Sequence, residues 1–351
     1  MVSNEMVYSR MVIEKIYVKN YRELYELINR KLKNCKLDTR GIKNPIEKFK
    51  KILLVKLQIT YQLIDNELNN IMRALFNIKT AHVFYRKLFE TTSNLDLDNC
   101  LKLFSRSRSI TRKLYVESSR MLRNSRGKTE ALEAFKHGLG TLLSVYKRKS
   151  RIIENIRKTL FEIYRLPDVS GDLVIVITGM PQVGKSTLLS KLTKAKPEIS
   201  PYPFTTKNII VGHLDIGEYG RVVLVDAPGL LDRPFDEMNI IETRAVLAIK
   251  YLADGIIYLF DINPSSYYTF DEQIRVYESI VNTLNIRNKI VAINKIDTTP
   301  PDAVELAINL LREKTGLEPI PISALTGFNL DKLVEKIKEI IVEKRSSLGL
   351  Q

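Results

Sequence analysis

The chain has 351 residues, of which 44% are hydrophobic and 27% are charged, a composition that excludes an intrinsically disordered protein. Its formal net charge of +15 is confined to one half: residues 1–170 carry 35 Lys and Arg against 17 Asp and Glu, and residues 171–351 carry 20 against 23. Two cysteines and three histidines, all far apart in the sequence, offer no zinc-type ligand set. No signal-peptide pattern opens the chain and no apolar run approaches about 20 residues, so we expect a cytoplasmic protein.

The first half of the chain has the periodicity of helices. Between residues 11 and 164 glycine is nearly absent, and Leu, Ile, Val and Tyr recur every three or four positions among charged residues. Breaks near residues 34–45, 77–80, 91–98 and 124–128 divide this region into segments that must bury their apolar stripes against one another. We therefore predict an all-α domain over residues 1–166, built as an antiparallel bundle of four or five helices.

Within this bundle, residues 101–150 hold 13 basic against 3 acidic side chains. Such a one-sided charge attracts a polyanion, although a charge run is also the usual pattern of a solvated helix face. The candidate nucleic-acid contacts are Arg106, Arg108, Arg112, Lys113, Arg120 and Arg123.

The pattern changes at residues 166–172, where turn-forming residues interrupt the last helix. Short apolar runs at residues 173–178, 209–214, 221–226, 255–261, 289–294 and 320–323 then alternate with helical stretches. Strands that alternate with helices indicate an α/β, doubly wound and mostly parallel sheet. This second domain is predicted to span residues 167–351.

A phosphate-loop string, GMPQVGKS, follows the first of these strands and opens a helix. Its glycines let backbone N–H groups wrap around phosphates, Lys185 adds charge at the β and γ phosphates, and Ser186 is a ligand for Mg²⁺. The nucleotide contacts predicted here are Gly179, Pro181, Gln182, Val183, Gly184, Lys185, Ser186 and Thr187.

Two further strings concern the γ phosphate. Asp226 ends a strand and begins the string DAPG, so its carboxylate is expected at Mg²⁺ and the N–H of Gly229 at the γ phosphate. Upstream, a proline-punctuated loop offers Thr206, with Thr205 as the alternative, as a hydroxyl that closes on Mg²⁺. Lys185, Thr206 and Gly229 are the predicted catalytic residues.

The string NKID at residues 294–297 selects the base, because the Asp297 carboxylate can accept both the ring N–H and the exocyclic amine of guanine. Asn294 is expected to tie this base loop to the phosphate loop, and Lys295 to lie along the base. After the last strand come Ser323, Ala324 and Leu325, where the Ala324 N–H is expected to bind the guanine carbonyl oxygen. GTP and GDP are the predicted ligands.

The residue after Gly229 is Leu230, which cannot orient an attacking water as a glutamine does. We therefore expect slow hydrolysis in the isolated protein. Arg233 lies nearby in the sequence and is a candidate internal arginine finger, with a solvent-exposed side chain as the favoured alternative.

Taken together, the strings RLPDVSGD, GMPQVGKSTLL, YPFTTKNIIVGH, DAPGLLDRPFDEMNIIE and NKID resemble the Nog family of nucleolar GTP-binding proteins, within the Obg-like group. The resemblance covers residues 166–297 closely, and the helical half agrees in kind and position. It implies assembly of the large ribosomal subunit, with ribosomal RNA and ribosomal proteins as partners. Because the chain ends soon after the sheet domain, we expect an archaeal member.

Two departures from the family pattern stand out. Gln182 occupies a position where the family usually has Asn, which puts potassium activation in question, and Ala227 replaces the usual Thr. Two other functions stay open: a membrane-associated or signalling GTPase whose basic bundle binds anionic lipid or a protein effector, and a scaffold that binds GTP without hydrolysing it.

Overall fold

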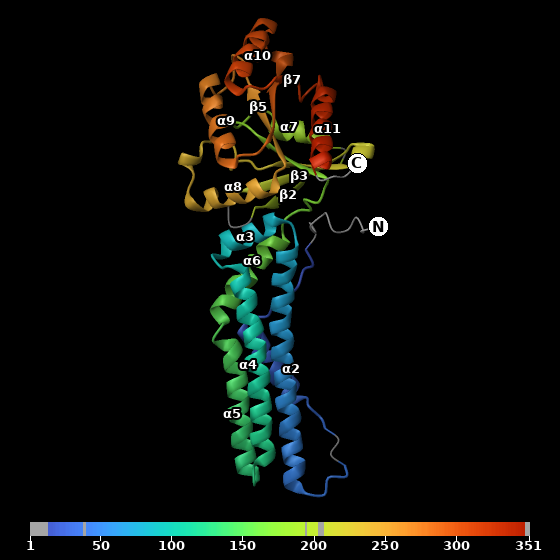
Figure 1. The fold of residues 1–351 in the computed structure, drawn as a ribbon, viewed down its shortest axis with the longest axis vertical. Coiled ribbons are helices and arrows are strands. Elements are labelled where there is room, and N and C mark those ends of the chain that lie inside the picture. The colour runs from blue at the N-terminus through green and yellow to red at the C-terminus, as the bar shows by residue number, and fades with distance from the viewer. Residues whose placement is uncertain (1–12, 38–39, 194, 203–206, 348–351) are drawn as a thin grey trace. The chain divides into compact units, whose positions relative to one another are not determined.

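A computed structural model describes residues 13–37, 40–193, 195–202 and 207–347 of the chain. These residues form two compact units that divide between Tyr164 and Arg165 (Figure 1). Residues 13–164 are the helical unit, and the described residues from 165 to 347 are the sheet unit. Each unit has its own hydrophobic core.

Six helices make up the described part of the helical unit. They are α1 (Tyr21–Lys33), α2 (Pro45–Thr80), α3 (Val83–Ser93), α4 (Leu97–Asn124), α5 (Lys128–Lys147) and α6 (Ser150–Tyr164). The long helices α2, α4 and α5 pack along one another, and α4 runs antiparallel to both α2 and α5 (Figure 1). The three-residue connection from α4 to α5 requires this antiparallel arrangement.

Local signals in the sequence set where these helices begin. Asn44 caps α2 by accepting hydrogen bonds from the N–H groups of Ile46 and Glu47, and Pro45 takes the first helical position, where its missing N–H is not needed. Asn20 and Glu23 form a reciprocal capping box at the start of α1. The predicted bundle is therefore present.

The predicted number of four or five helices is wrong. The additional boundary lies between α5 and α6, where Arg148 keeps helical dihedral angles of φ −61° and ψ −19°. Because a turn of this kind needs neither glycine nor proline, the sequence shows no break there.

The sheet unit is built on seven strands in the order β2-β3-β4-β1-β5-β6-β7. They are β1 (Leu173–Thr178), β2 (Glu198–Pro201), β3 (Asn208–Asp215), β4 (Arg221–Asp226), β5 (Gly255–Asp261), β6 (Asn288–Asn294) and β7 (Ile320–Pro321). The pairs β2–β3 and β3–β4 are antiparallel, and the others are parallel. Every residue of β1 and of β5 is buried, as expected of central strands covered on both faces.

Helices connect these strands and cover the sheet (Figure 1). They are α7 (Lys185–Leu192), α8 (Ile240–Leu252), α9 (Phe270–Leu284), α10 (Pro301–Thr315) and α11 (Leu330–Ser347). The predicted doubly wound, mostly parallel sheet preceded by an all-α unit is confirmed. The loops after β1, β4, β5 and β6 meet at the carboxyl edge of the sheet, where ligands bind in such folds.

Strand β2 was not expected from the sequence. Three of its four residues are exposed, and it pairs only with β3 at the edge of the sheet. An edge strand with one buried residue has no apolar alternation to mark it. No helix in the described residues has the length and apolar character to cross a bilayer.

Candidate nucleotide-binding site

The phosphate loop connects β1 to α7 through backbone shapes that require glycine. Gly179 has φ +135°, and a Cβ there would lie 2.6 Å from the carbonyl oxygen of Leu259. Gly184 has φ +101°, and its Cβ would lie 2.3 Å from Nδ2 of Asn294. Gln182 also has a positive φ, of 65°. A side chain at either glycine would strain the loop and push it away from its neighbours.

The Lys185 ammonium lies over this loop. It donates hydrogen bonds to the carbonyl oxygens of Gly179 at 2.7 Å and Met180 at 2.8 Å, and the residue is only 8% exposed. Burial lowers the pKa of Lys185, while the carboxylates of Asp226 and Asp232 act in the opposite direction. The ammonium is thus held at the mouth of the phosphate loop with two acidic neighbours.

Ser186 and Asp226 come together from α7 and β4. The Ser186 hydroxyl donates to Oδ2 of Asp226 at 2.8 Å, and Asp226 is fully buried. Burial raises the pKa of Asp226, opposed by Lys185 and by the hydrogen bond from Ser186. The second oxygen, Oδ1, is buried and has no hydrogen-bond partner among the described residues.

This pair fits a magnesium ion. An unpartnered carboxylate oxygen beside a serine hydroxyl supplies hard oxygen donors, and Mg²⁺ in nucleotide sites uses one or two such protein ligands together with phosphate oxygens. The described residues hold no cluster of three or more His, Cys, Asp or Glu side chains, so a separate all-protein metal site is absent from that part of the chain. A bound Mg²⁺ would neutralise charge on the phosphates.

The Gly229 loop follows β4. Gly229 has φ +75°, and its N–H donates to Oδ2 of Asp232 at 2.8 Å. A Cβ at Gly229 would lie 2.7 Å from Nζ of Lys207, so the Lys207 side chain lies against this glycine. The predicted residues Thr205 and Thr206 lie outside the described residues.

Asn294 joins the base loop to the phosphate loop. Its Nδ2 donates to the carbonyl oxygen of Val183 at 2.8 Å, which is the tie expected from the sequence. Its Oδ1 accepts from the backbone N–H of Ala324 at 2.8 Å. In this structure the Ala324 N–H, which is expected to bind the guanine oxygen, is bonded to Asn294, so a bound guanine would have to replace that bond.

The base loop borders a cavity of about 270 Å³ lined by Ile296, Asp297, Ser323, Thr326 and Phe328. Asp297 is exposed and its carboxylate has no partner among the described residues. Leu325 is 66% exposed, and Thr187 is exposed on α7. The free Asp297 carboxylate is thus available to a ligand.

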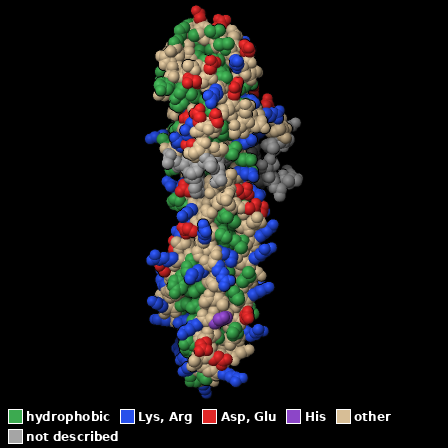
Figure 2. All heavy atoms as spheres, turned by 90° about the vertical axis from the view of Figure 1, so that its left-hand side faces the viewer, with side chains coloured by type: hydrophobic (Ala, Val, Ile, Leu, Met, Phe, Trp, Pro, Cys, Tyr) green, Lys and Arg blue, Asp and Glu red, His purple; other side chains and the backbone are tan. Residues whose placement is uncertain are grey.

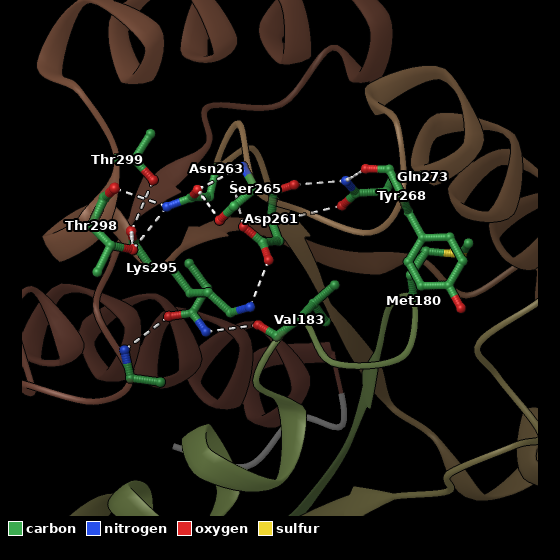
Figure 3. Close-up of polar contacts among 12 residues, drawn as sticks. Met180, Val183, Asp261, Asn263, Ser265, Tyr268, Gln273, Lys295, Thr298 and Thr299 are labelled. Carbon is green, nitrogen blue, oxygen red and sulfur yellow. Dashed lines mark hydrogen bonds and ion pairs between the residues drawn. The ribbon is translucent and has the colours of Figure 1, made fainter.

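Lys295 adopts φ +62° and donates from Nζ to Oδ2 of Asp261 at 2.7 Å (Figure 3). Asp261 is the last residue of β5 and is 3% exposed. The sequence interpretation missed Asp261, although its position at the carboxyl end of a buried strand was a usable signal. This ion pair ties the base-loop lysine to the end of β5.

Two expectations about hydrolysis residues change. Leu230 is fully buried, so it contributes to the core as well as lacking a group to orient water. Arg233 is neither a finger nor simply solvated: its guanidinium donates to Oε1 of Glu242 at 2.7 Å. Its Nε is buried and has no hydrogen-bond partner within the ranges that the structure describes.

The basic candidates all lie on α4. Arg106, Arg112, Lys113, Arg120 and Arg123 are exposed, and Figure 2 shows Lys and Arg side chains distributed along the helical unit. Arg108 is different, because it binds both carboxylate oxygens of Asp65 at 2.9 and 2.8 Å and Oδ1 of Asn69 at 2.9 Å. Arg108 is therefore removed from the set of candidate nucleic-acid contacts.

A phosphate loop, a buried acid at the next strand and an NKID base loop at the carboxyl edge of one sheet define a P-loop GTPase domain. Residues 174–295 match the family described as 50S ribosome-binding GTPase, and residues 15–170 match the NOG1 N-terminal helical domain. The chain belongs to the Nog family.

Named relatives agree with this membership. Nucleolar GTP-binding protein 1 of Drosophila melanogaster is 30% identical over 249 residues, 70% of this chain and 38% of that protein. The protein of the same name from Saccharomyces cerevisiae is 26% identical over 86% of this chain and 47% of its own length. An uncharacterized protein of Methanocaldococcus jannaschii is 33% identical over 71% of this chain and 70% of its own length. The chain spans less than half of the Drosophila and Saccharomyces proteins.

Proposed function

We propose that this protein binds GTP and GDP with Mg²⁺ and hydrolyses GTP, acting as a nucleotide-switched assembly factor for the large ribosomal subunit. The observation that carries the nucleotide part is the Asn294 bridge. It connects Val183 of the phosphate loop with Ala324 of the last loop, so the groups that select phosphate and base form one site. The exposed Asp297 carboxylate supports guanine as the base.

Competitive calorimetry tests this selection. GTP and GDP are expected to bind in the presence of Mg²⁺, and ATP to displace neither at equal concentration, because adenine offers no pair of donors to Asp297. Equal displacement by ATP would overturn the assignment. Omitting Mg²⁺ is expected to weaken GTP binding more than GDP binding, because GTP carries the larger phosphate charge.

Slow hydrolysis is part of the proposal. The buried Leu230 cannot position a water, and Arg233 is engaged by Glu242. A partner that reorganises the Gly229 loop is then required for fast turnover. Single-turnover hydrolysis should accelerate on addition of purified large ribosomal subunit; unchanged turnover would favour a scaffold that binds GTP without using it.

The ribosomal part rests on the matched family, described as 50S ribosome-binding GTPase, and on the exposed basic side chains of α4. We propose that the helical unit contacts ribosomal RNA in the cytoplasm and that nucleotide state controls this contact. Filter binding with ribosomal RNA in GTP analogue and in GDP tests it. Flotation with anionic liposomes tests the alternative function. Binding to the liposomes, together with no specific binding of ribosomal RNA, would favour the lipid alternative.

A further inference from the structure

The γ-phosphate position of the proposed site already contains an anion from the chain itself. The N–H of Gly229, the group expected to bind a γ-phosphate oxygen, donates instead to Oδ2 of Asp232 at 2.8 Å. A carboxylate oxygen and a phosphate oxygen are both charged acceptors for a backbone N–H. They therefore compete for the same donor.

The surroundings of Asp232 match those of a terminal phosphate. Burial lowers the pKa of Lys185, and the carboxylates of Asp226 and then Asp232 oppose that shift, so the Asp232 carboxylate lies within electrostatic reach of the phosphate-loop lysine. The Lys207 side chain lies against Gly229 on the same loop. Asp232 thus accepts the Gly229 N–H within electrostatic reach of Lys185, while Lys207 lies against the same glycine.

We propose that Asp232 is a specificity-determining residue that takes the hydrogen-bonding place of a γ-phosphate oxygen at Gly229 and sets how strongly the site prefers GTP over GDP. This inference rests on the proposed nucleotide function. GDP leaves the Asp232–Gly229 bond intact, whereas GTP must break it before its γ phosphate reaches the same N–H. Since a ligand shifts an equilibrium only by its differential affinity for the two states, this bond reduces the preference for GTP.

The same bond gives the Gly229 loop a defined arrangement without the γ phosphate. Gly229 has no unsatisfied N–H in this state, and loss of the γ phosphate after hydrolysis allows Asp232 to return. The chain therefore contains its own acceptor for the Gly229 N–H once the γ phosphate has left. This favours a change of the Gly229 loop between two defined states over a gradual change.

A graded pair of substitutions tests the inference. Asp232→Ala removes the acceptor and Asp232→Asn replaces it with a neutral one, which is weaker by roughly half. The ratio of the Kd for GDP to the Kd for a non-hydrolysable GTP analogue, measured with Mg²⁺, should rise about tenfold in the Ala variant, which corresponds to about 1.4 kcal/mol. The Asn variant should lie between the Ala variant and the parent protein.

Asp236→Ala is the matched control, because it removes the same charge four positions along the chain. The Asp236 side chain is 69% exposed, and its ion pair with Arg275 is a weak one, with an oxygen 3.4 Å from one nitrogen. The ratio of the two Kd values in this control variant should equal that of the parent protein. A repeat at about 1 M salt, where the Debye length is about 3 Å, removes long-range charge effects. An unchanged ratio in both Asp232 variants, or an equal rise in the Asp236 control, would overturn the inference.

A second measurement reads the hydrogen bond directly. With ¹⁵N-glycine labelling, the Gly229 amide resonance should shift between the parent protein and Asp232→Ala in GDP, and coincide in GTP analogue. If the two Gly229 resonances coincide in both nucleotides, Asp232 does not accept the Gly229 N–H. If the parent protein binds no guanine nucleotide at all, the proposed function fails; if it binds GDP normally and only these differences are missing, the inference alone fails.

Discussion

At the scale of single residues, the carboxylate of Asp226 is an unfavourable arrangement in the site without ligand. It is fully buried, its Oδ1 has no hydrogen-bond partner in the described part of the chain, and burial raises its pKa. A buried acceptor without a partner costs about 1–3 kcal/mol. In the proposed function the site keeps this unfavourable charge for Mg²⁺, at the expense of stability without ligand.

This gives a prediction for Asp226→Asn in the nucleotide-free protein. At pH 7 the variant should be more stable than the parent by about 1–3 kcal/mol, measured by scanning calorimetry of the sheet-unit transition. Because the folded-state pKa of Asp226 is raised, the penalty exists above that pKa and disappears below the unfolded-state value of about 4. The advantage should therefore shrink as the pH falls toward 4. An advantage that grows on acidification would contradict the assigned shift.

In the proposed function Asp297 selects the base, and its exposed carboxylate has no competing partner in the described chain. Asp297→Asn should shift the preference from guanine toward xanthine nucleotide, because the amide presents a donor where xanthine has a carbonyl. Bidentate base contacts are worth about 1–3 kcal/mol, so competitive binding should show a change of about 5- to 150-fold. Asp302→Asn, an exposed acid at the start of α10, is the control that should leave selectivity unchanged.

At the scale of elements, α4 presents two different faces. Its buried face includes Ser118, which lies so close to α5 that a Cβ on Gly138 would be 2.7 Å from the Ser118 Cβ. Arg108 lies beside this face and joins α4 to α2 through Asp65 and Asn69. The exposed cations point away from both partners. Helix packing therefore separates Arg108, which holds α4 to α2, from the exposed cations of α4, which stay available to a partner.

Opposite effects of two substitutions test this division. Arg108→Gln should lower the free energy of unfolding by about 0.5–1 kcal/mol, a value discounted for the 36% exposure of its side chain, and should leave RNA affinity unchanged. Arg106→Gln should leave stability unchanged and weaken RNA binding. Thermal unfolding and filter binding on both variants provide the comparison. Equal loss of RNA affinity in the two would restore Arg108 as a contact.

At the scale of the whole molecule, the proposed function requires that the bound nucleotide changes the affinity for RNA. Lys102, Arg106, Lys113 and Arg120 are exposed at spacings of four, seven and seven residues along α4, which places them on one face over roughly 27 Å of helix. Such a row neutralises successive phosphates and makes affinity depend on salt.

Replacing Arg106, Lys113 and Arg120 by Gln together should reduce the slope of log affinity against log salt by about 2–3, since each phosphate contact contributes about 0.7–0.9. The difference in RNA affinity between the protein bound to GTP analogue and the protein bound to GDP should also become smaller. An intact GTP and GDP affinity is the internal control, because these residues are on α4 and far in sequence from the nucleotide site. An unchanged slope would leave α4 as a merely solvated face.

The sequence by itself determined the order of helices and strands, the sheet class and the nucleotide strings. These follow from local chemistry: the periodicity of apolar residues fixes the element, and GMPQVGKS or NKID needs only neighbouring residues to present its groups. It failed at β2 and at the α5–α6 boundary, where neither apolar alternation nor a turn-forming residue marks the chain.

Only the tertiary structure decided which of these groups are already in use. Arg108 is paired with Asp65, the Ala324 N–H with Asn294, and the Gly229 N–H with Asp232. Two of these partners are more than 25 positions away, and the third depends on a positive φ at Gly229. A hydrogen bond joins atoms that are close in space, and no run of neighbouring letters records that distance.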